Sequence, residues 1–311
     1  MAKQKTLKNS VSFNGIGLHS GKKVNVRILP ADENSGITFI RTDVSGGVVI
    51  KACSKNVVDT RLATTLGLEG ITLGTVEHLL AAFYGLEIDN AVVEVDSCEI
   101  PIMDGSALPF VELIQTAGIE TQKKIKKIIV IKRPIKVRDG RKVALMLPAR
   151  DFKITYSISF DHPFLKNQSL STVYSETSFK DELCGARTFG FLKEVEWLRS
   201  QGLVAGGSLE NAIVIDDTKI INRDCMRFPD EFVRHKILDC MGDISLLGAT
   251  IRGHIIAERS GHCLNQKLVR KVIESPSSWT FAEEIPAATS YKDTIREMVL
   301  DPAFSYCYVA S

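Results

Sequence analysis

The sequence predicts an α+β protein that contains two copies of one strand–helix–strand unit. Three observations lead to this prediction. The chain of 311 residues has an ordinary globular composition and is long enough for two domains. A hairpin pattern at residues 21–31 recurs at residues 140–149. A helix pattern at residues 76–85 recurs in the same order at residues 233–242.

The hairpin pattern comes first in each copy. Residues 21–24 (GKKV) lead to Leu-Pro-Ala at residues 29–31, and residues 140–143 (GRKV) lead to Leu-Pro-Ala at residues 147–149. Each segment has a turn glycine, two basic residues and then alternating apolar residues. This order is typical of the second strand of a β-hairpin.

The helix pattern carries a histidine in each copy. Residues 76–78 (VEH) and 233–235 (VRH) each begin an apolar helical pattern, with a glycine seven residues after the histidine. We expect each helix to end near its glycine. Strand patterns follow both helices, at residues 91–95 and 251–257. Two matches in the same order indicate duplication.

The lysine-rich residues 123–127 are a predicted boundary between the copies. We therefore expect a first repeat at residues 1–125, a second at 126–280 and a C-terminal tail at 281–311. The hairpin glycine and the helix histidine are 57 residues apart in the first copy and 95 in the second. This difference predicts an insertion in the second repeat near residues 187–214, and insertions on repeated scaffolds usually carry function.

Charge and cysteine usage exclude several classes of protein. The net charge is +2, from 39 Lys and Arg against 37 Asp and Glu, so no general field favours nucleic acid. The seven cysteines form no Cys-x-x-Cys pair and are expected to be free thiols. The N-terminus lacks a signal-peptide pattern, and no segment has the roughly 20 apolar residues of a membrane span. We expect a cytoplasmic protein.

The candidate chemistry lies on the two repeated helices. His235 and Asp239 are four residues apart and share one helix face, as two metal ligands from one helix do. Alone, such a pair is more often a surface ion pair. His78 holds the equivalent position in the first copy, so pseudo-twofold packing would complete a His-His-Asp set with the open fourth position of a catalytic zinc. Glu77 points in another direction and suits a general base; the alternative is a solvated helix residue.

Five motifs make the chain resemble a known family from about residue 5 to about residue 275. The chain is similar to the zinc-dependent UDP-3-O-acyl-N-acetylglucosamine deacetylases of lipid A biosynthesis. The resemblance implies two domains of similar topology, each a β-sheet layered on α-helices, with the active site between them. The motifs are residues 75–79 (TVEHL), 100–107 (IPIMDGSA), 185–191 (GARTFGF), 232–239 (FVRHKILD) and 260–262 (SGH).

The resemblance also implies a cofactor and roles for individual residues. It assigns Zn²⁺ to His78, His235 and Asp239, and the role of general base to Glu77. A hydroxyl and a protonated imidazole would stabilise the oxyanion, and a carboxylate would keep that imidazole charged. These three groups belong to Thr188, His262 and Asp243. The sequence leaves open whether His262 or Glu77 protonates the leaving amine, and whether the cell uses zinc or ferrous iron. For Asp243, the alternative is a plain polar residue after a helix that ends at Gly242.

The implied substrate is a UDP-sugar that carries an acyl chain, so its site must be amphipathic. Residues 191–198 have apolar side chains at helical spacing, which normally form a core. The resemblance implies instead that the insertion makes a tunnel for the acyl chain. The candidate lining residues are Phe191, Val195, Val204, Leu209 and Val214, and Phe189 is a further candidate contact. For the diphosphate and uracil the candidates are Lys236, Lys142, Arg259 and Phe160. The family commonly has Lys where Arg259 stands.

Other histidines and the tail have weaker assignments. His19 is a candidate substrate contact, His162 precedes a loop, and His254 is expected to be structural. By resemblance, the tail can act as a degradation signal for a membrane protease.

Two alternatives to the deacetylase remain: another zinc hydrolase on this scaffold, and a binding module without catalysis. The filled catalytic positions argue against the second. Acyl-chain length and oligomeric state cannot be read from the sequence.

Overall fold

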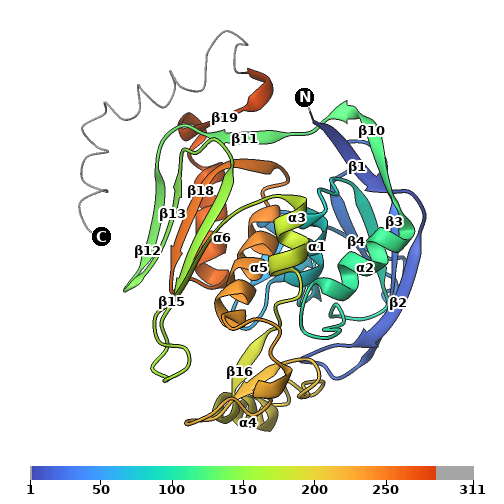
Figure 1. Cartoon of the computed structure of the whole chain (residues 1–311). Coiled ribbons are helices and arrows are strands. Elements are labelled where there is room, and N and C mark those ends of the chain that lie inside the picture. The colour runs from blue at the N-terminus through green and yellow to red at the C-terminus, as the bar shows by residue number, and fades with distance from the viewer. Residues whose placement is uncertain (1, 285–311) are drawn as a thin grey trace, which may run out of the picture.

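The computed structural model describes residues 2–284, in which helices lie between two large β-sheets (Figure 1). The first sheet comes from the N-terminal half and has the order β2 (Val11–Ile16), β3 (Lys23–Pro30), β9 (Ala91–Val95), β4 (Ile37–Arg41), β5 (Val48–Lys51). The second comes from the C-terminal half and contains β12 (Ile135–Asp139), β13 (Lys142–Leu147), β18 (Thr250–Glu258), β14 (Phe152–Ile158) and β15 (Gln168–Val173).

The remaining strands form shorter pairings. The strand β1 (Lys3–Leu7) pairs with β10 (Ile119–Ile125), and β11 (Ile128–Ile131) pairs with both β18 and β19 (Trp279–Phe281). A three-stranded sheet contains β6 (Val57–Asp59), β7 (Thr65–Leu68) and β8 (Ile71–Leu73). The helices are α1 (Glu77–Gly85), α2 (Leu108–Ala117), the short α3 (Glu176–Ser178), α4 (Leu192–Ser200), α5 (Glu231–Ser245) and α6 (His262–Ile273).

The two large sheets have the same connectivity, which confirms the predicted α+β fold with two repeats of similar topology. In the first, β3 pairs antiparallel with β2 and β9, β9 pairs parallel with β4, and β4 pairs antiparallel with β5. In the second, β13, β12, β18, β14 and β15 repeat these pairings in the same senses. The helix before the central strand is α1 in one repeat and α5 in the other, and the helix after it is α2 or α6. The exact domain limits stay a prediction.

Strand alternation explains why each sheet packs on helices. In β3 the side chains of Val24, Val26 and Ile28 are buried while their neighbours are exposed, so one face of the sheet is apolar. Apolar residues at helical spacing in α1 and α5, including Leu79 and Ile237, are also fully buried. The core therefore lies between the sheets, around the two helices that carry the predicted ligands.

One predicted helix end is wrong. Gly85 is the last residue of α1, as expected, but α5 continues past Gly242 to Ser245. A Cβ atom on Gly242 would lie 2.8 Å from the carbonyl carbon of Glu77 and closer still to its oxygen. The glycine is therefore needed where the start of α1 crosses α5, and not as a helix terminator.

The segment within the predicted insertion forms a separate small unit (Figure 1). The strands β16 (Phe189–Phe191) and β17 (Ile213–Ile215) pair in parallel, and α4 follows β16 directly. No residue of α4 is buried, and Trp197 is 63% exposed. The apolar spacing in this helix therefore does not build a core.

Three sequence expectations concern single features of the chain. Among the cysteines whose side chains the structure describes, Cys53, Cys98, Cys184, Cys240 and Cys263 are free thiols. Within residues 2–284, no helix combines the length and the apolar character that crossing a membrane requires. Of the predicted tail at residues 281–311, Phe281 ends β19 and Ala282–Glu284 form a short helical turn, while residues 285–311 lie outside the described residues.

Candidate active site

A cavity of about 520 Å³ lies between the two repeats. Both repeats contribute side chains to its wall, and the candidate metal ligands, Glu77, Thr188 and His262 all line it. The position between the repeats agrees with the expected location of the site. The first repeat contributes the loop after β2, the loop between β6 and β7 and the start of α1, and the second contributes α5, β16 and the start of α6.

The structure brings the three predicted ligands together. The Nε2 atoms of His235 and His78 lie 3.3 Å and 3.5 Å from Oδ1 of Asp239. The two imidazole rings are 5.0 Å apart between centroids and nearly perpendicular. One possible ligand atom from each residue lies within 4.8 Å of the corresponding atoms of the other two, and all three residues are buried. The crossing of α1 and α5 at Gly242 is what brings a histidine from each helix to one point.

The polar atoms of this cluster fit a bound cation. Nδ1 of His235 donates a hydrogen bond to the Ala186 carbonyl at 3.0 Å, because that oxygen can only accept. Burial lowers the pKa of His235 to about 3 although Asp239 opposes this, so the ring is neutral and Nε2 carries a lone pair. That lone pair faces Oδ1 of Asp239, which accepts no hydrogen bond from the described residues. Two electron-rich atoms this close favour a cation between them.

Lys236 lies beside the ligand carboxylate. Its Nζ donates to Oδ2 of Asp239 at 2.5 Å, so Oδ1 is the oxygen that faces the two histidines. Burial opposes the charge on Lys236, but Asp239 raises the pKa of the ammonium above its usual value. Lys236 lines the cavity as expected of a substrate contact, yet its closest partner is Asp239.

Glu77 lies at the start of α1, next to a ligand. Its side chain is buried, and Oε2 accepts a hydrogen bond from the backbone N–H of Thr64 at 3.0 Å. Oε1 is 3.9 Å from Nε2 of His262. Burial raises the pKa of Glu77, while the positive charge of His262 opposes the shift. A carboxylate held by one oxygen, with a raised pKa, is suited to accepting a proton.

His262 is paired with a fully buried carboxylate. Its Nδ1 lies 2.9 Å from Oδ2 of Asp243, and Asn265 donates to the same oxygen at 2.8 Å. Burial alone would lower the pKa of His262, but Asp243 raises it to about 9. The imidazole is therefore charged at neutral pH. Asp243 lies inside α5, so the alternative of a polar residue beyond the helix end is wrong.

Thr188 and its neighbours in β16 also line the cavity. The Thr188 backbone N–H donates to the carbonyl of Gly105 at 2.8 Å, and its carbonyl accepts from Ile213. Gly105 has φ of +87°, and a Cβ atom there would lie 3.3 Å from Cγ2 of Thr188 and overlap the Asn211 backbone. This glycine lets the two loops meet beside the cavity.

The predicted substrate contacts divide into two groups. Phe160, Phe189, Phe191 and Lys142 line the cavity, and the ring of Phe160 lies 5.8 Å from that of Phe189 and 5.6 Å from that of Phe191. The other candidates are not among the residues that line it; they are Arg259, Val195, Val204, Leu209 and Val214. Of these, Leu209 is half-exposed and Val214 is buried in β17, so their predicted role in a tunnel is not tested by this cavity.

Some residues that hold the side chains of the site have no signal in the sequence. Thr64 is the clearest: its N–H holds Glu77, and its Oγ1 donates to Oδ1 of Asp243 at 2.5 Å, across 179 residues of sequence. No local pattern marks a threonine whose partners are so distant. His19 does line the cavity, as expected. His254 instead binds Thr155 at 2.8 Å on β14, in agreement with a structural role, and His162 contacts the carbonyl of Asp216.

Comparison with known proteins gives one consistent result. The family model described as "LpxC: UDP-3-O-acyl N-acetylglycosamine deacetylase" matches residues 4–274. Curated proteins named UDP-3-O-acyl-N-acetylglucosamine deacetylase are also similar over almost their whole length. The relative from Syntrophus aciditrophicus is 49% identical over 94% of this chain and 93% of its own. The relative from Myxococcus xanthus is 51% identical over 91% of this chain and 90% of its own. The relative from Acidithiobacillus ferrooxidans is 48% identical over 95% of this chain and 98% of its own.

Proposed function

The chain belongs to the UDP-3-O-acyl-N-acetylglucosamine deacetylase family, and from that premise we propose that it hydrolyses the acetamide of UDP-3-O-acyl-N-acetylglucosamine in lipid A biosynthesis. The products are acetate and the free 2-amine. One observation carries the proposal: a buried His-His-Asp cluster, a carboxylate and a charged imidazole meet in one cavity between the repeats.

His78, His235 and Asp239 are the proposed zinc ligands. Two imidazoles and one carboxylate are a common donor set for a catalytic zinc. The unpartnered oxygen of Asp239 and the facing lone pair of His235 support a cation at this point. When bound, zinc polarises a carbonyl and lowers the pKa of water to roughly 7.

Glu77 is the proposed general base. The Thr64 N–H fixes one of its carboxylate oxygens, and the other faces the cavity beside His262. It would take a proton from the attacking water as the oxygen–carbon bond forms. Burial raises its pKa, which makes the carboxylate a stronger base near neutral pH.

His262 and Thr188 are the proposed partners of the oxyanion. Asp243 keeps the imidazole charged, so Nε2 can donate to negative charge that develops on the amide oxygen. Thr188, which lines the same cavity, would add its hydroxyl. When the carbon–nitrogen bond breaks, the departing amine takes a proton from His262 or from Glu77, which now carries the proton of the water.

The remaining contacts suit an amphipathic substrate. Phe160, Phe189 and Phe191 form an apolar cluster at the wall of the cavity, which suits the start of an acyl chain. Lys142 lines the same cavity and is a candidate for a phosphate. Lys236, Arg259 and the insertion residues Val195, Val204, Leu209 and Val214 stay predictions, as do the cytoplasmic location and degradation through the tail.

Acetate release from the UDP-sugar tests this function. Wild-type protein is treated with a chelator, assayed, reloaded with zinc and assayed again. We expect activity to disappear with the metal and to return with zinc. A chelated protein that still releases acetate would remove the metal from the proposal. A zinc-loaded protein that leaves this substrate intact but hydrolyses another acylated sugar would indicate a different hydrolase on the same fold.

A further inference from the structure

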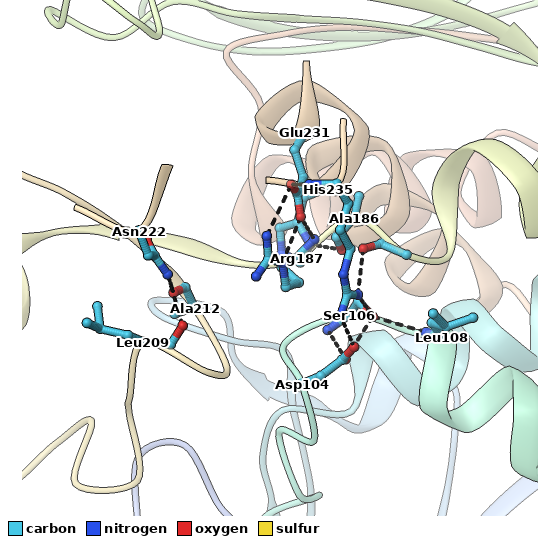
Figure 2. Close-up of polar contacts among 12 residues, drawn as sticks. Asp104, Ser106, Leu108, Ala186, Arg187, Leu209, Ala212, Asn222, Glu231 and His235 are labelled. Atoms are coloured by element: carbon cyan, nitrogen blue, oxygen red, sulfur yellow. Dashed lines mark hydrogen bonds and ion pairs between the residues drawn. The ribbon is translucent and has the colours of Figure 1, made fainter. Parts of the chain in front are cut away.

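A buried ion pair lies one helical turn before the ligand His235 (Figure 2). Glu231 is the first residue of α5 and is fully buried, and Arg187 is 4% exposed. Nε of Arg187 lies 2.9 Å from Oε1 of Glu231. Burying two opposite charges is costly unless the geometry is good and further hydrogen bonds satisfy them. Such a pair next to a metal ligand therefore calls for a role.

The orientation of His235 depends on a carbonyl outside its own helix. Its Nδ1–H donates to Ala186, which belongs to the loop before β16 (Figure 2). This contact assigns the proton to Nδ1 and leaves Nε2 free to face the other ligands. A hydrogen-bond partner of this kind sets both the tautomer and the ring orientation of a ligating histidine. The position of the Ala186 carbonyl therefore determines whether His235 is ready to bind a metal.

Glu231 fixes the loop directly next to Ala186. The backbone N–H of Arg187 donates to Oε1 of Glu231 at 3.1 Å, in addition to the contact from the guanidinium. On the other carboxylate oxygen, the backbone N–H of Arg227 donates at 2.6 Å. One carboxylate at the start of α5 thus holds the loop at the residue after Ala186, in a fixed place relative to His235.

Arg227 fixes the same loop on the other side of Ala186. Its guanidinium donates to the Gly185 carbonyl at 2.9 Å and to Ser106 at 3.2 Å, and it binds Oδ2 of Asp104 at 2.7 Å. Asp104 and Ser106 belong to the first repeat, before α2, so the network also ties the two repeats together (Figure 2).

We infer that Glu231, with Arg187 and Arg227, is a positioning residue that holds the Ala186 carbonyl so that His235 presents Nε2 to the metal. Their contacts reach His235 through the Gly185–Arg187 backbone. The inference rests on the proposed metal site and adds to it the part of the chain that pre-organises one ligand. Partners of ligating histidines typically change metal affinity by about 10- to 100-fold when they are removed.

The test compares two carboxylate-to-amide variants. Glu231→Gln removes the negative charge that binds Arg187 and the backbone N–H of Arg227. Asp89→Asn is the matched control, because Asp89 also accepts a backbone N–H and binds a buried lysine, Lys126, at 3.1 Å, but does not line the active-site cavity. Zinc affinity is measured by competition with a chelator, and thermal unfolding reports the loss of stability in each variant.

We expect Glu231→Gln to bind zinc about 10- to 100-fold more weakly than wild type, while Asp89→Asn keeps wild-type affinity at a comparable loss of stability. A second readout uses no metal: the Nδ1–H signal of His235 in metal-free protein labelled with ¹⁵N-histidine, assigned by its absence in His235→Gln. This proton should exchange with water at least about tenfold faster in Glu231→Gln than in the control.

Each outcome decides between the two proposals. Wild-type zinc affinity and unchanged exchange in folded Glu231→Gln would overturn the inference and leave the deacetylase intact. If Asp89→Asn loses as much zinc affinity as Glu231→Gln, the loss comes from general destabilisation of the protein, and the inference is also overturned. If Glu231→Gln does not fold, the same two measurements are made on Arg227→Lys, because the side chain of Arg227 is partly exposed. If wild type and His235→Gln bind zinc equally, the metal site itself is wrong, and the exchange measurement alone judges the network.

Discussion

Replacing Gly242 with alanine tests whether the helix crossing determines the active site. Alanine is favoured over glycine inside a helix by about 1 kcal/mol, so the local effect on α5 is stabilising. The added Cβ, however, would lie 2.8 Å from the carbonyl carbon and 3.0 Å from the Cα of Glu77. Both distances are well below ordinary contact, and both neighbours are backbone atoms that cannot rotate away.

The magnitude follows from the displacement that the clash requires. To restore ordinary contact of about 3.5 Å, α1 and α5 must separate by something on the order of 1 Å at Glu77. Overpacking of this kind typically costs about 1–3 kcal/mol, which exceeds the gain in helix propensity. The same movement takes His78 away from His235 and Asp239. A misplacement of about 1 Å at a reacting centre reduces the rate by about 100-fold.

The assay is acetate release from the zinc-loaded variant, with zinc content and thermal unfolding measured on the same sample. We expect kcat/KM to fall by about 100-fold and the unfolding temperature to fall by a few degrees. Gly74→Ala is the control, because a Cβ at Gly74 would meet its nearest atom, Oγ1 of Thr65, at 3.5 Å. Wild-type turnover and stability in Gly242→Ala would refute the view that this glycine sets the approach of the helices.

Four further variants test single groups. His235→Ala should lose stoichiometric zinc on dialysis, because three ligands leave no substitute; full zinc content would contradict the assignment. Glu77→Ala should keep its zinc but release acetate at least about 100-fold more slowly, and near-normal turnover would exclude it as the base. In Asp243→Asn the alkaline limb of the kcat/KM profile should move to lower pH. The carboxylate raises the pKa of His262 to about 9, and the charged ring is lost as pH rises through that value. An unmoved limb at full zinc occupancy would sink this explanation. Phe191→Ala should raise KM about tenfold for long acyl chains and less for short ones, which kinetics with both substrates would check.

The sequence predicted the repeats and the approach of the three candidate ligands because both leave local patterns. A turn glycine, alternating apolar residues and a histidine on an amphipathic helix each fall within about ten residues, and they recur in the same order. His78 and His235 could therefore be paired before any coordinates were considered. The same reasoning placed Asp239 on the face of His235, and the structure brings it within 3.3 Å of that ring.

Features that depend on distant contacts could not be predicted in this way. Thr64 binds two groups whose positions follow only from the packing of both repeats. Gly242 was misread because a glycine near the end of a helical pattern usually marks a C-cap, whereas here it permits a helix crossing. In residues 191–198 the helical spacing alone would favour a buried face, whereas the resemblance implied a tunnel, and no residue of α4 is buried.

The helices α1 and α5 share a histidine and a glycine at equivalent positions but differ at the positions of their carboxylates, and this difference has a consequence for symmetry. The position that holds Asp239 in α5 is Ala82 in α1, and the position of Glu77 in α1 is Arg234 in α5. Two identical copies related by a twofold axis would present the same groups from both sides, so base and ligand carboxylate could not be separated. Because both copies lie in one polypeptide, each could change independently. The two copies can therefore supply different groups to one site: α5 supplies the carboxylate proposed as a metal ligand, and α1 supplies the carboxylate proposed to accept a proton from water.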